Sequence, residues 1–177
     1  LQETIRAIIH LFPAEYPEII KQFSLMLCFD AWVGVQDRHF HNWGVVRNIY
    51  GSHAPYFSPI YDSARGLFWN FHESKINEWI RARQLEQQIE NQIKNSMPQV
   101  GLEGRLKANH FEVVRYLLSD HEHSIRPVAR KVFTSEALQR VQKMIHSEFS
   151  GLLSPNRILL ITKCLEIRHQ HFTQLFT

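Results

Sequence analysis

The chain has 177 residues, of which 44% are hydrophobic and 21% charged, and its formal net charge is only +3. A chain of this length and composition can bury one sizeable core, which argues against a disordered segment and predicts a single domain over residues 1–177. Because the net charge is small and no block of like charge occurs, direct nucleic-acid binding is not expected.

Membrane insertion and disulfide bonding are also not expected. The longest apolar run, Leu25 to Val35, is interrupted by Asp30 and is too short for a membrane span, and no signal peptide is recognisable. Cys28 and Cys164 lie far apart in apolar helical patterns, which favours buried free thiols over a disulfide or a zinc site. We therefore expect a cytoplasmic protein.

The first third of the chain predicts two helices followed by a hairpin. Apolar residues at helical spacing predict helices over residues 1–11 and 17–34. The stretches 43–49 and 56–61 are rich in β-branched and aromatic residues, and residues 50–55 between them have turn composition. These two stretches therefore predict a small β-hairpin.

The remainder of the chain, residues 73–177, is predicted to be helical. The apolar pattern predicts one helix over residues 73–97, ended by Pro98 and followed by a loop over residues 98–108. Further helices are predicted to begin at Asn109, at Thr134 and at Ser154 with Pro155. The predicted fold class is mainly α with a small β-hairpin.

A polar cluster, Gln-Asp-Arg-His-Phe-His-Asn at residues 36–42, directly follows the most apolar helix. Asp37 and Asn42 have the spacing of the aspartate and asparagine in the catalytic loop of protein kinases. Phosphoryl transfer needs a carboxylate beside the attacking hydroxyl and oxygen ligands that hold Mg²⁺ against the phosphates. Asp62, expected at the end of the second hairpin strand, could supply a further ligand. The pattern indicates Asp37 as a catalytic base and Asn42 with Asp62 as magnesium ligands.

The residues around this cluster leave alternatives open. His39 and Arg38 are grouped with Asp37 as catalytic candidates; for His39 a hydrogen bond that orients the loop is favoured over proton transfer, and Arg38 could meet a phosphate or an acidic neighbour. Asp30 could accept hydrogen bonds from the loop or face solvent. Arg65 is a candidate contact to the substrate or to an activation segment. The nearby aromatic residues are expected in the core, namely Trp32, Trp43, Phe68 and Trp69.

Three histidines close to the cluster raise a second chemical possibility. His39, His41 and His53 could indicate a zinc site or an HNH-type nuclease. No paired cysteines accompany them, and an ordered set of Asp, Asn and Asp suits oxygen coordination of Mg²⁺ better than imidazole coordination of zinc. We therefore favour magnesium.

Taken together, several segments resemble the catalytic region of HipA-like serine/threonine kinases. They are Phe29 to Gly34, Asp37-Arg38-His39 with Asn42, Ser58 to Asp62, and residues 97–104 followed by 109–112. The resemblance implies a protein-kinase-like C-lobe of the HipA type that uses ATP and Mg²⁺ to phosphorylate serine or threonine on a protein substrate. It also implies that Asp37 is the base and that Asn42 and Asp62 bind magnesium and nucleotide. Members of this family are toxin-type bacterial kinases, often paired with a DNA-binding antitoxin, so an antitoxin is a further expected partner.

The sequence departs from kinases in two ways. It has no Gly-x-Gly-x-x-Gly loop and no lysine in a Val-Ala-Ile-Lys context, so we expect the N-lobe that covers ATP to be absent and supplied elsewhere. The start at Leu1, directly in a helical pattern, suggests a fragment of a longer polypeptide, and a processed subunit would look the same. Without an N-lobe, we expect the isolated chain to be inactive. Asp62 is followed by Ser63-Ala64-Arg65-Gly66 rather than Phe-Gly, which favours the HipA-like type over the eukaryotic type.

Two alternative functions remain open. The chain could be a pseudokinase lobe that serves as a protein-interaction module, in which the polar groups of the loop only satisfy backbone donors. It could also be a fragment of a phosphoinositide-type lipid kinase, because those enzymes share an Asp-Arg-His loop followed by Asn. The sequence lacks a basic amphipathic membrane-binding face, which ranks the lipid kinase lower.

Overall fold

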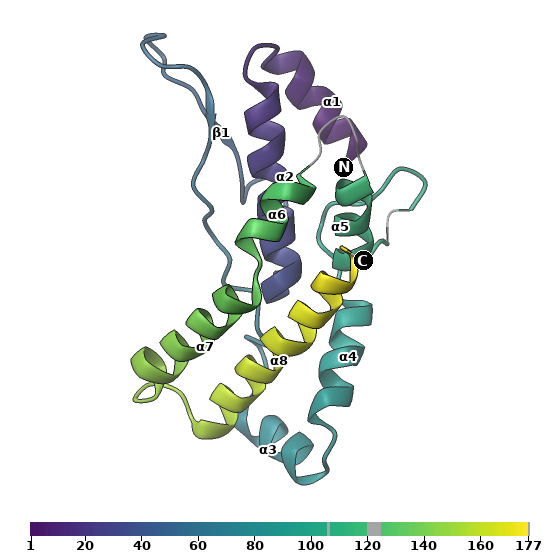
Figure 1. The fold of residues 1–177 in the computed structure, drawn as a ribbon, viewed down its shortest axis with the longest axis vertical. Helices are drawn as coiled ribbons and strands as arrows, with labels where there is room; N and C mark the ends of the chain where they lie inside the picture. Colours follow the sequence, from purple (N-terminus) through teal and green to yellow (C-terminus); the bar gives the residue numbers. More distant parts are fainter. Residues whose placement is uncertain (106, 120–124, 177) are drawn as a thin grey trace.

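Helix α2 (Tyr16–Val33) forms the centre of the fold (Figure 1). It is apolar around most of its circumference, so neighbouring elements cover it on several sides. Helices α1 (Gln2–Leu11), α5 (His110–Ser119) and α8 (Pro155–Gln174), together with strand β2 (Tyr56–Phe57), pack against it. The computed structural model describes residues 1–105, 107–119 and 125–176, and these form a mainly α-helical structure with a small two-stranded antiparallel sheet.

Helix α8 is the second organising element. It packs against α3 (Glu73–Arg81), α4 (Leu85–Asn95) and α7 (Ser135–Phe149), and Figure 1 shows it passing between α7 and α4. The predicted caps are confirmed where α7 and α8 begin, because the Thr134 and Ser154 hydroxyls accept hydrogen bonds from backbone N–H groups of the first turn.

The predicted hairpin is present but its ladder is short. Strands β1 (Val45–Val46) and β2 (Tyr56–Phe57) pair with Val45 opposite Phe57 and Val46 opposite Tyr56. The Trp43 ring stacks on Phe57 at 6.1 Å between centroids and also contacts Phe23 of α2 at 4.6 Å. The prediction that Asp62 ends a strand is wrong, because β2 already ends at Phe57. Aromatic packing on α2, rather than a long ladder, therefore anchors the hairpin.

Two helix predictions need correction. The single helix predicted over residues 73–97 is divided into α3 and α4, and Arg83 between them has a φ of 57°. A short helix, α6 (Arg126–Val132), was not predicted; Pro127 lies in its first turn. The predicted loop over residues 98–108 contains an isolated bridge between Leu102 and Arg105, and its residue 106 lies outside the described residues.

Other sequence predictions are confirmed. Asn109 and Glu112 form a reciprocal cap at the start of α5, with each backbone N–H donating to the other side chain, at 2.8 and 3.0 Å. Cys28 and Cys164 are buried and free, and burial raises the pKa of both thiols.

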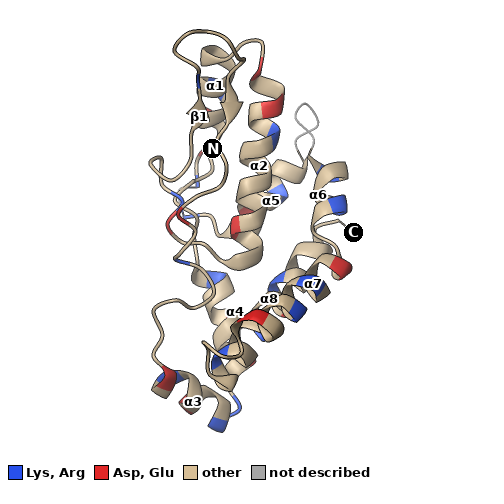
Figure 2. Cartoon of the chain, turned by 90° about the vertical axis from the view of Figure 1, so that its left-hand side faces the viewer, with Lys and Arg blue, Asp and Glu red and all other residues tan. Residues whose placement is uncertain are grey.

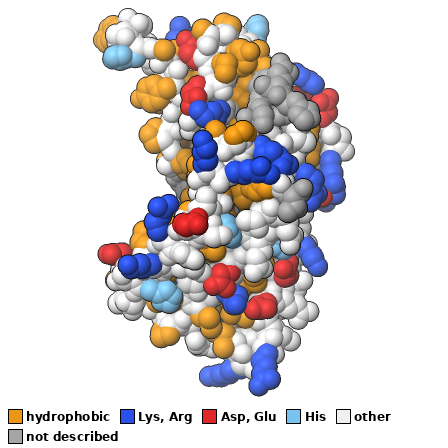
Figure 3. Space-filling view, viewed as in Figure 1, with side chains coloured by type: hydrophobic (Ala, Val, Ile, Leu, Met, Phe, Trp, Pro, Cys, Tyr) orange, Lys and Arg blue, Asp and Glu red, His pale blue; other side chains and the backbone are white. Residues whose placement is uncertain are grey.

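Two surface properties bear on possible partners. Within the described ranges, no helix is long and apolar enough to cross a membrane. Basic and acidic residues are distributed over most of the helices rather than concentrated on one element (Figure 2). Figure 3 shows that both kinds of charge are interspersed on one face, with hydrophobic side chains exposed mainly in its upper part.

Candidate active site

The polar loop at residues 36–42 begins where α2 ends. Gly34 terminates the helix in the left-handed conformation, with a φ of 75°, and its N–H donates to Asp30 O at 2.7 Å. Two backbone hydrogen bonds join the start of the loop to residues 65–67. They run from Leu67 N to Val33 O, at 3.0 Å, and from Gln36 N to Arg65 O, at 3.1 Å. The loop therefore starts beside the segment that follows Asp62.

Arg38 lies at the centre of this region and is fully buried. Its Nε and Nη2 donate to the two carboxylate oxygens of Asp30, at 2.8 and 2.9 Å. Its Nη1 donates to Asn42 O and Tyr61 O, both at 2.7 Å, and its Nη2 also donates to Ser63 Oγ at 2.9 Å. Every N–H of the guanidinium thus has an acceptor.

This arrangement resolves two of the alternatives left open by the sequence. Arg38 binds an acidic neighbour, and the alternative in which it meets a phosphate is wrong, since the side chain is buried and its donors are all used. Asp30 is buried and accepts hydrogen bonds from the loop rather than facing solvent. Burial raises the pKa of Asp30, and the hydrogen bonds and charge of Arg38 oppose that shift. Arg38 is therefore a positioning residue.

The bonds from Arg38 bring the two predicted halves of the magnesium site together at the level of the backbone. One nitrogen, Nη1, holds the carbonyl of Asn42 and the carbonyl of Tyr61. Since Ser63 is bonded to the same guanidinium, both neighbours of Asp62 are fixed beside the loop. A further hydrogen bond, from the Tyr61 hydroxyl to His41 O at 2.9 Å, reinforces this connection.

The side chain of Asn42 is buried and oriented. Its Nδ2 donates to Asp37 O at 2.8 Å, which connects the two ends of the loop. This bond fixes the orientation of the amide, and the amide oxygen is the acceptor that could bind a cation. An amide oxygen and a carboxylate are hard ligands of the kind that Mg²⁺ prefers, so the donor set of Asn42 and Asp62 fits this ion.

Asp62 has a left-handed backbone, with a φ of 49°, and an exposed side chain. Among the described residues its carboxylate makes no hydrogen bond or ion pair. Leu67 and Phe68 also have positive φ values, of 50° and 60°. Non-glycine residues rarely adopt this conformation, and where they do the surrounding contacts must hold them. The bonds from Arg38 to Tyr61 and Ser63 provide such contacts for Asp62.

The carboxylate of Asp37 is partly buried and has three neighbours. Its Oδ2 lies 3.2 Å from Arg65 Nε, and its Oδ1 accepts a hydrogen bond from Gln99 Nε2 at 3.1 Å. His39 Nε2 lies 4.0 Å from Oδ1, while His39 Nδ1 accepts the backbone N–H of His41 at 3.2 Å. The predicted orienting role of His39 is supported by this bond within the loop. Gln99 was not predicted as a site residue, although it lies in the segment 97–104 that forms part of the HipA-like resemblance.

A buried network behind the loop was also not predicted. His110 Nε2 lies 2.7 Å from Val35 O, and His110 Nδ1 lies 3.2 Å from Ser96 Oγ. Arg168 Nη2 donates to the same hydroxyl at 3.1 Å, and Arg168 Nη1 donates to Ala31 O at 2.7 Å. Burial, together with the charge of Arg168, lowers the pKa of His110 to about 4. A neutral imidazole can thus donate to Val35 O and accept from Ser96.

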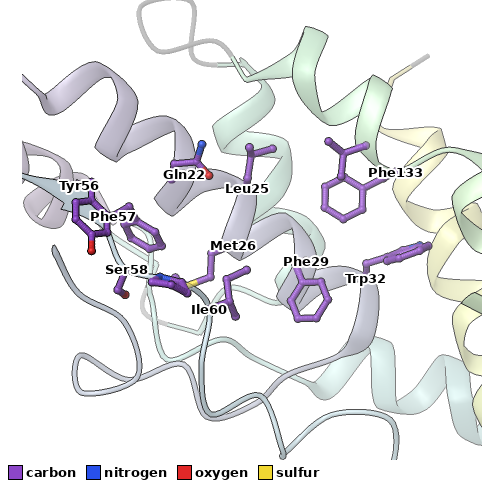
Figure 4. A pocket seen from close by; sticks show the side chains of 12 residues that line it. Gln22, Leu25, Met26, Phe29, Trp32, Tyr56, Phe57, Ser58, Ile60 and Phe133 are labelled. Carbon is purple, nitrogen blue, oxygen red and sulfur yellow. The ribbon is translucent and has the colours of Figure 1, made fainter. Parts of the chain in front are cut away.

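Two cavities lie near these elements. The larger, of about 490 Å³, lies between α2, β2 and the C-terminal end of α6, and Figure 4 shows Met26, Phe29 and Ile60 lining it. No charged side chain lines it within the described part of the chain, which makes it unsuited to phosphate. The smaller cavity, of about 220 Å³, is lined by Gln36 and Arg65 and is therefore adjacent to Asp37.

The histidines and aromatic residues near the loop have different positions. In the described part of the chain, no group of three or more His, Cys, Asp or Glu side chains is arranged to hold a metal ion. Trp32 and Phe68 are in the core and Trp43 is half-buried. The prediction that Trp69 lies in the core is wrong, because its side chain is exposed. Its ring packs against the guanidinium of Arg65, whose central carbon lies 5.5 Å from the ring centroid.

Comparison with known proteins gave no relative. No protein-family model, no curated protein and no solved structure matched the chain.

Proposed function

We propose that this chain is the catalytic C-lobe of a HipA-like kinase that transfers phosphate from ATP to a serine or threonine of a protein. The observation that carries the proposal is the bonding of Arg38 Nη1 to both Asn42 O and Tyr61 O. This contact supports a site in which the Asn42 and Asp62 side chains would hold one Mg²⁺. Bound there, Mg²⁺ would neutralise charge on the phosphates of ATP.

In this proposal Asp37 acts on the acceptor hydroxyl. The hydroxyl oxygen forms a bond to the terminal phosphorus of ATP, the bond from that phosphorus to the bridging oxygen breaks, and Asp37 takes the hydroxyl proton. The partly exposed carboxylate of Asp37 is suited to this role, because a substrate hydroxyl can reach it. The fixed backbone of the loop supports the orientation of Asp37 through the bond from Asn42.

The test is phosphate transfer to protein acceptors by the full protein. We expect Asp37→Asn to lower the rate about a hundredfold or more, since general-base catalysis typically contributes at least that factor. Glu148→Gln, which removes an exposed carboxylate at the end of α7, is the matched control and should keep the rate. Full activity in Asp37→Asn would exclude Asp37 as the base.

Two further measurements separate the alternative functions. Titration calorimetry with ATP and Mg²⁺ should give a binding signal for a kinase lobe. A protein that binds a partner tightly without any nucleotide signal would instead be an interaction module. Transfer to lipid vesicles but not to protein acceptors would assign the chain to the lipid kinases.

A further inference from the structure

The smaller cavity beside Asp37 has a rigid frame. Arg157 donates from Nη1 to Phe68 O, at 3.2 Å, and from Nη2 to Phe71 O, which holds the wall formed by residues 68–71. Arg168 Nη2 donates to Gln92 Oε1 at 2.6 Å and to Ser96 Oγ, which holds the opposite wall at the end of α4. The cavity is therefore bounded by backbone and side chains that two other arginines already fix.

Arg65 is the one charged side chain that lines this cavity in the part of the chain that the structure describes. The other polar lining residues are amides and hydroxyls, among them Gln36, Asn70, Gln92, Asn95 and Ser96. Arg65 is about half exposed, its Nε faces Asp37, and its guanidinium lies against the exposed ring of Trp69. Its terminal nitrogens make no hydrogen bond to any described residue.

A guanidinium with a free pair of N–H groups matches a carboxylate or phosphate, which can accept two parallel hydrogen bonds. Packing on Trp69 orients the guanidinium without using its donors. The side-chain amides of Gln36 and Asn70, which make no hydrogen bond to a described residue, can both donate to and accept from a peptide backbone. The charge of Arg65 and its place next to Asp37 both favour an anionic side chain of a polypeptide.

We propose that the cavity between Gln36, Arg65, Trp69 and Asn95 is a substrate subsite that binds an acidic or phosphorylated residue close to the acceptor serine or threonine. This rests on the proposed kinase function. Arg65 lies between this subsite and the base, because its Nε faces Asp37 while its terminal nitrogens remain available to an anion. Arg65 is thereby a specificity-determining residue.

The test uses a positional peptide library with one serine and with alanine, lysine, glutamate or phosphoserine at each neighbouring position. Binding to the full protein is measured by titration calorimetry with the serine replaced by alanine, and phosphate transfer is measured with the serine present. We expect glutamate or phosphoserine at one position to bind about five- to tenfold more tightly than lysine. Arg65→Gln should remove this preference, whereas Arg81→Gln, at the exposed end of α3, should keep it.

The outcomes of this test are distinct. No preference for an anion, or an equal preference in Arg65→Gln, would overturn the subsite. Tighter binding of phosphoserine than of glutamate would assign the subsite to phosphate, and the reverse order would assign it to carboxylate. Selective binding that depends on Arg65 but is never followed by phosphate transfer would keep the subsite and refute the kinase function. Transfer without any dependence on Arg65 would keep the kinase and remove the subsite.

Discussion

Replacing Arg38 with methionine removes the guanidinium that joins α2, the loop and the segment around Asp62. The variant leaves a buried carboxylate at Asp30 and two carbonyls, of Asn42 and Tyr61, without their donor. Removing one partner of a buried ion pair costs about 3–5 kcal/mol. That is a large share of the roughly 5–15 kcal/mol by which a domain is stable. We expect Arg38→Met to lower the free energy of unfolding by about 3–5 kcal/mol.

Urea unfolding followed by circular dichroism measures this change as a shift of the midpoint at constant slope. Arg6→Met is the matched control, because the Arg6–Glu103 pair has a similar distance, 3.1 Å, but its side chains are 66% and 63% exposed. An exposed pair contributes less than about 1 kcal/mol. If Arg38→Met costs no more than Arg6→Met, Arg38 does not hold the site together.

A second substitution isolates the ion pair from the remaining bonds of Arg38. Asp30→Leu combined with Arg38→Met removes both buried charges, so the double variant should lose about 2 kcal/mol less than the sum of the two single variants. The double variant still lacks the donor to the carbonyls of Asn42 and Tyr61. We therefore expect its affinity for Mg²⁺ and ATP to be lower than that of the unsubstituted protein. Strict additivity of the single variants would refute the coupling.

Three further changes test the elements around the site. The pKa of His110 is about 4 in the folded state against an ordinary 6.5, so the unfolded state takes up the proton first as the pH falls. The free energy of unfolding should therefore drop by about 3 kcal/mol between pH 6.5 and 4. His110→Gln should flatten this part of the dependence of stability on pH, as measured by urea unfolding at each pH. Gly34→Ala should lower the free energy of unfolding by about 1–3 kcal/mol, since its φ is 75° and the new methyl group would lie 2.7 Å from Arg168. Gly151→Ala, which has open space around the new methyl group, is the control and should change the free energy of unfolding by less than about 0.5 kcal/mol in thermal unfolding. Thr134→Ala should lower the free energy of unfolding by about 1 kcal/mol through loss of the α7 cap, and an unchanged urea midpoint would contradict that assignment.

Local signals in the sequence were sufficient for the main helices and their caps. The apolar face of α2 and the capping residues Asn109, Thr134 and Ser154 depend on neighbours within a few positions, so their pattern can be seen directly. The sequence also carries a signal for the break between α3 and α4. The large apolar residues Ile76, Trp79 and Ile80 stand at helical spacing, and the next large apolar residue, Leu85, comes five positions after Ile80.

The sequence indicated several side chains of the candidate site, but not the contacts that bring them together. The spacing of Asp37 and Asn42 indicated a loop, but the position of Asp62 depends on bonds from Arg38 and not on the hairpin ladder. Gln99 and His110 come from distant elements, and their contacts with the loop leave no periodic signal in the sequence. For Arg168 one signal existed, because a charged residue continues the buried face of α8 that includes Cys164 and Phe172.

The central claim is that Asn42 and Asp62 together hold one divalent cation on ATP. Mn²⁺ accepts the same oxygen ligands as Mg²⁺ and broadens the NMR signals of nearby nuclei, so adding it with ATP to the isotope-labelled protein locates the cation. We predict that the amide signals of residues 37–42 and 61–63 broaden most, and that the variant carrying Asn42→Ala and Asp62→Asn loses this effect. Broadening centred elsewhere, or broadening that persists in this variant, would contradict the account.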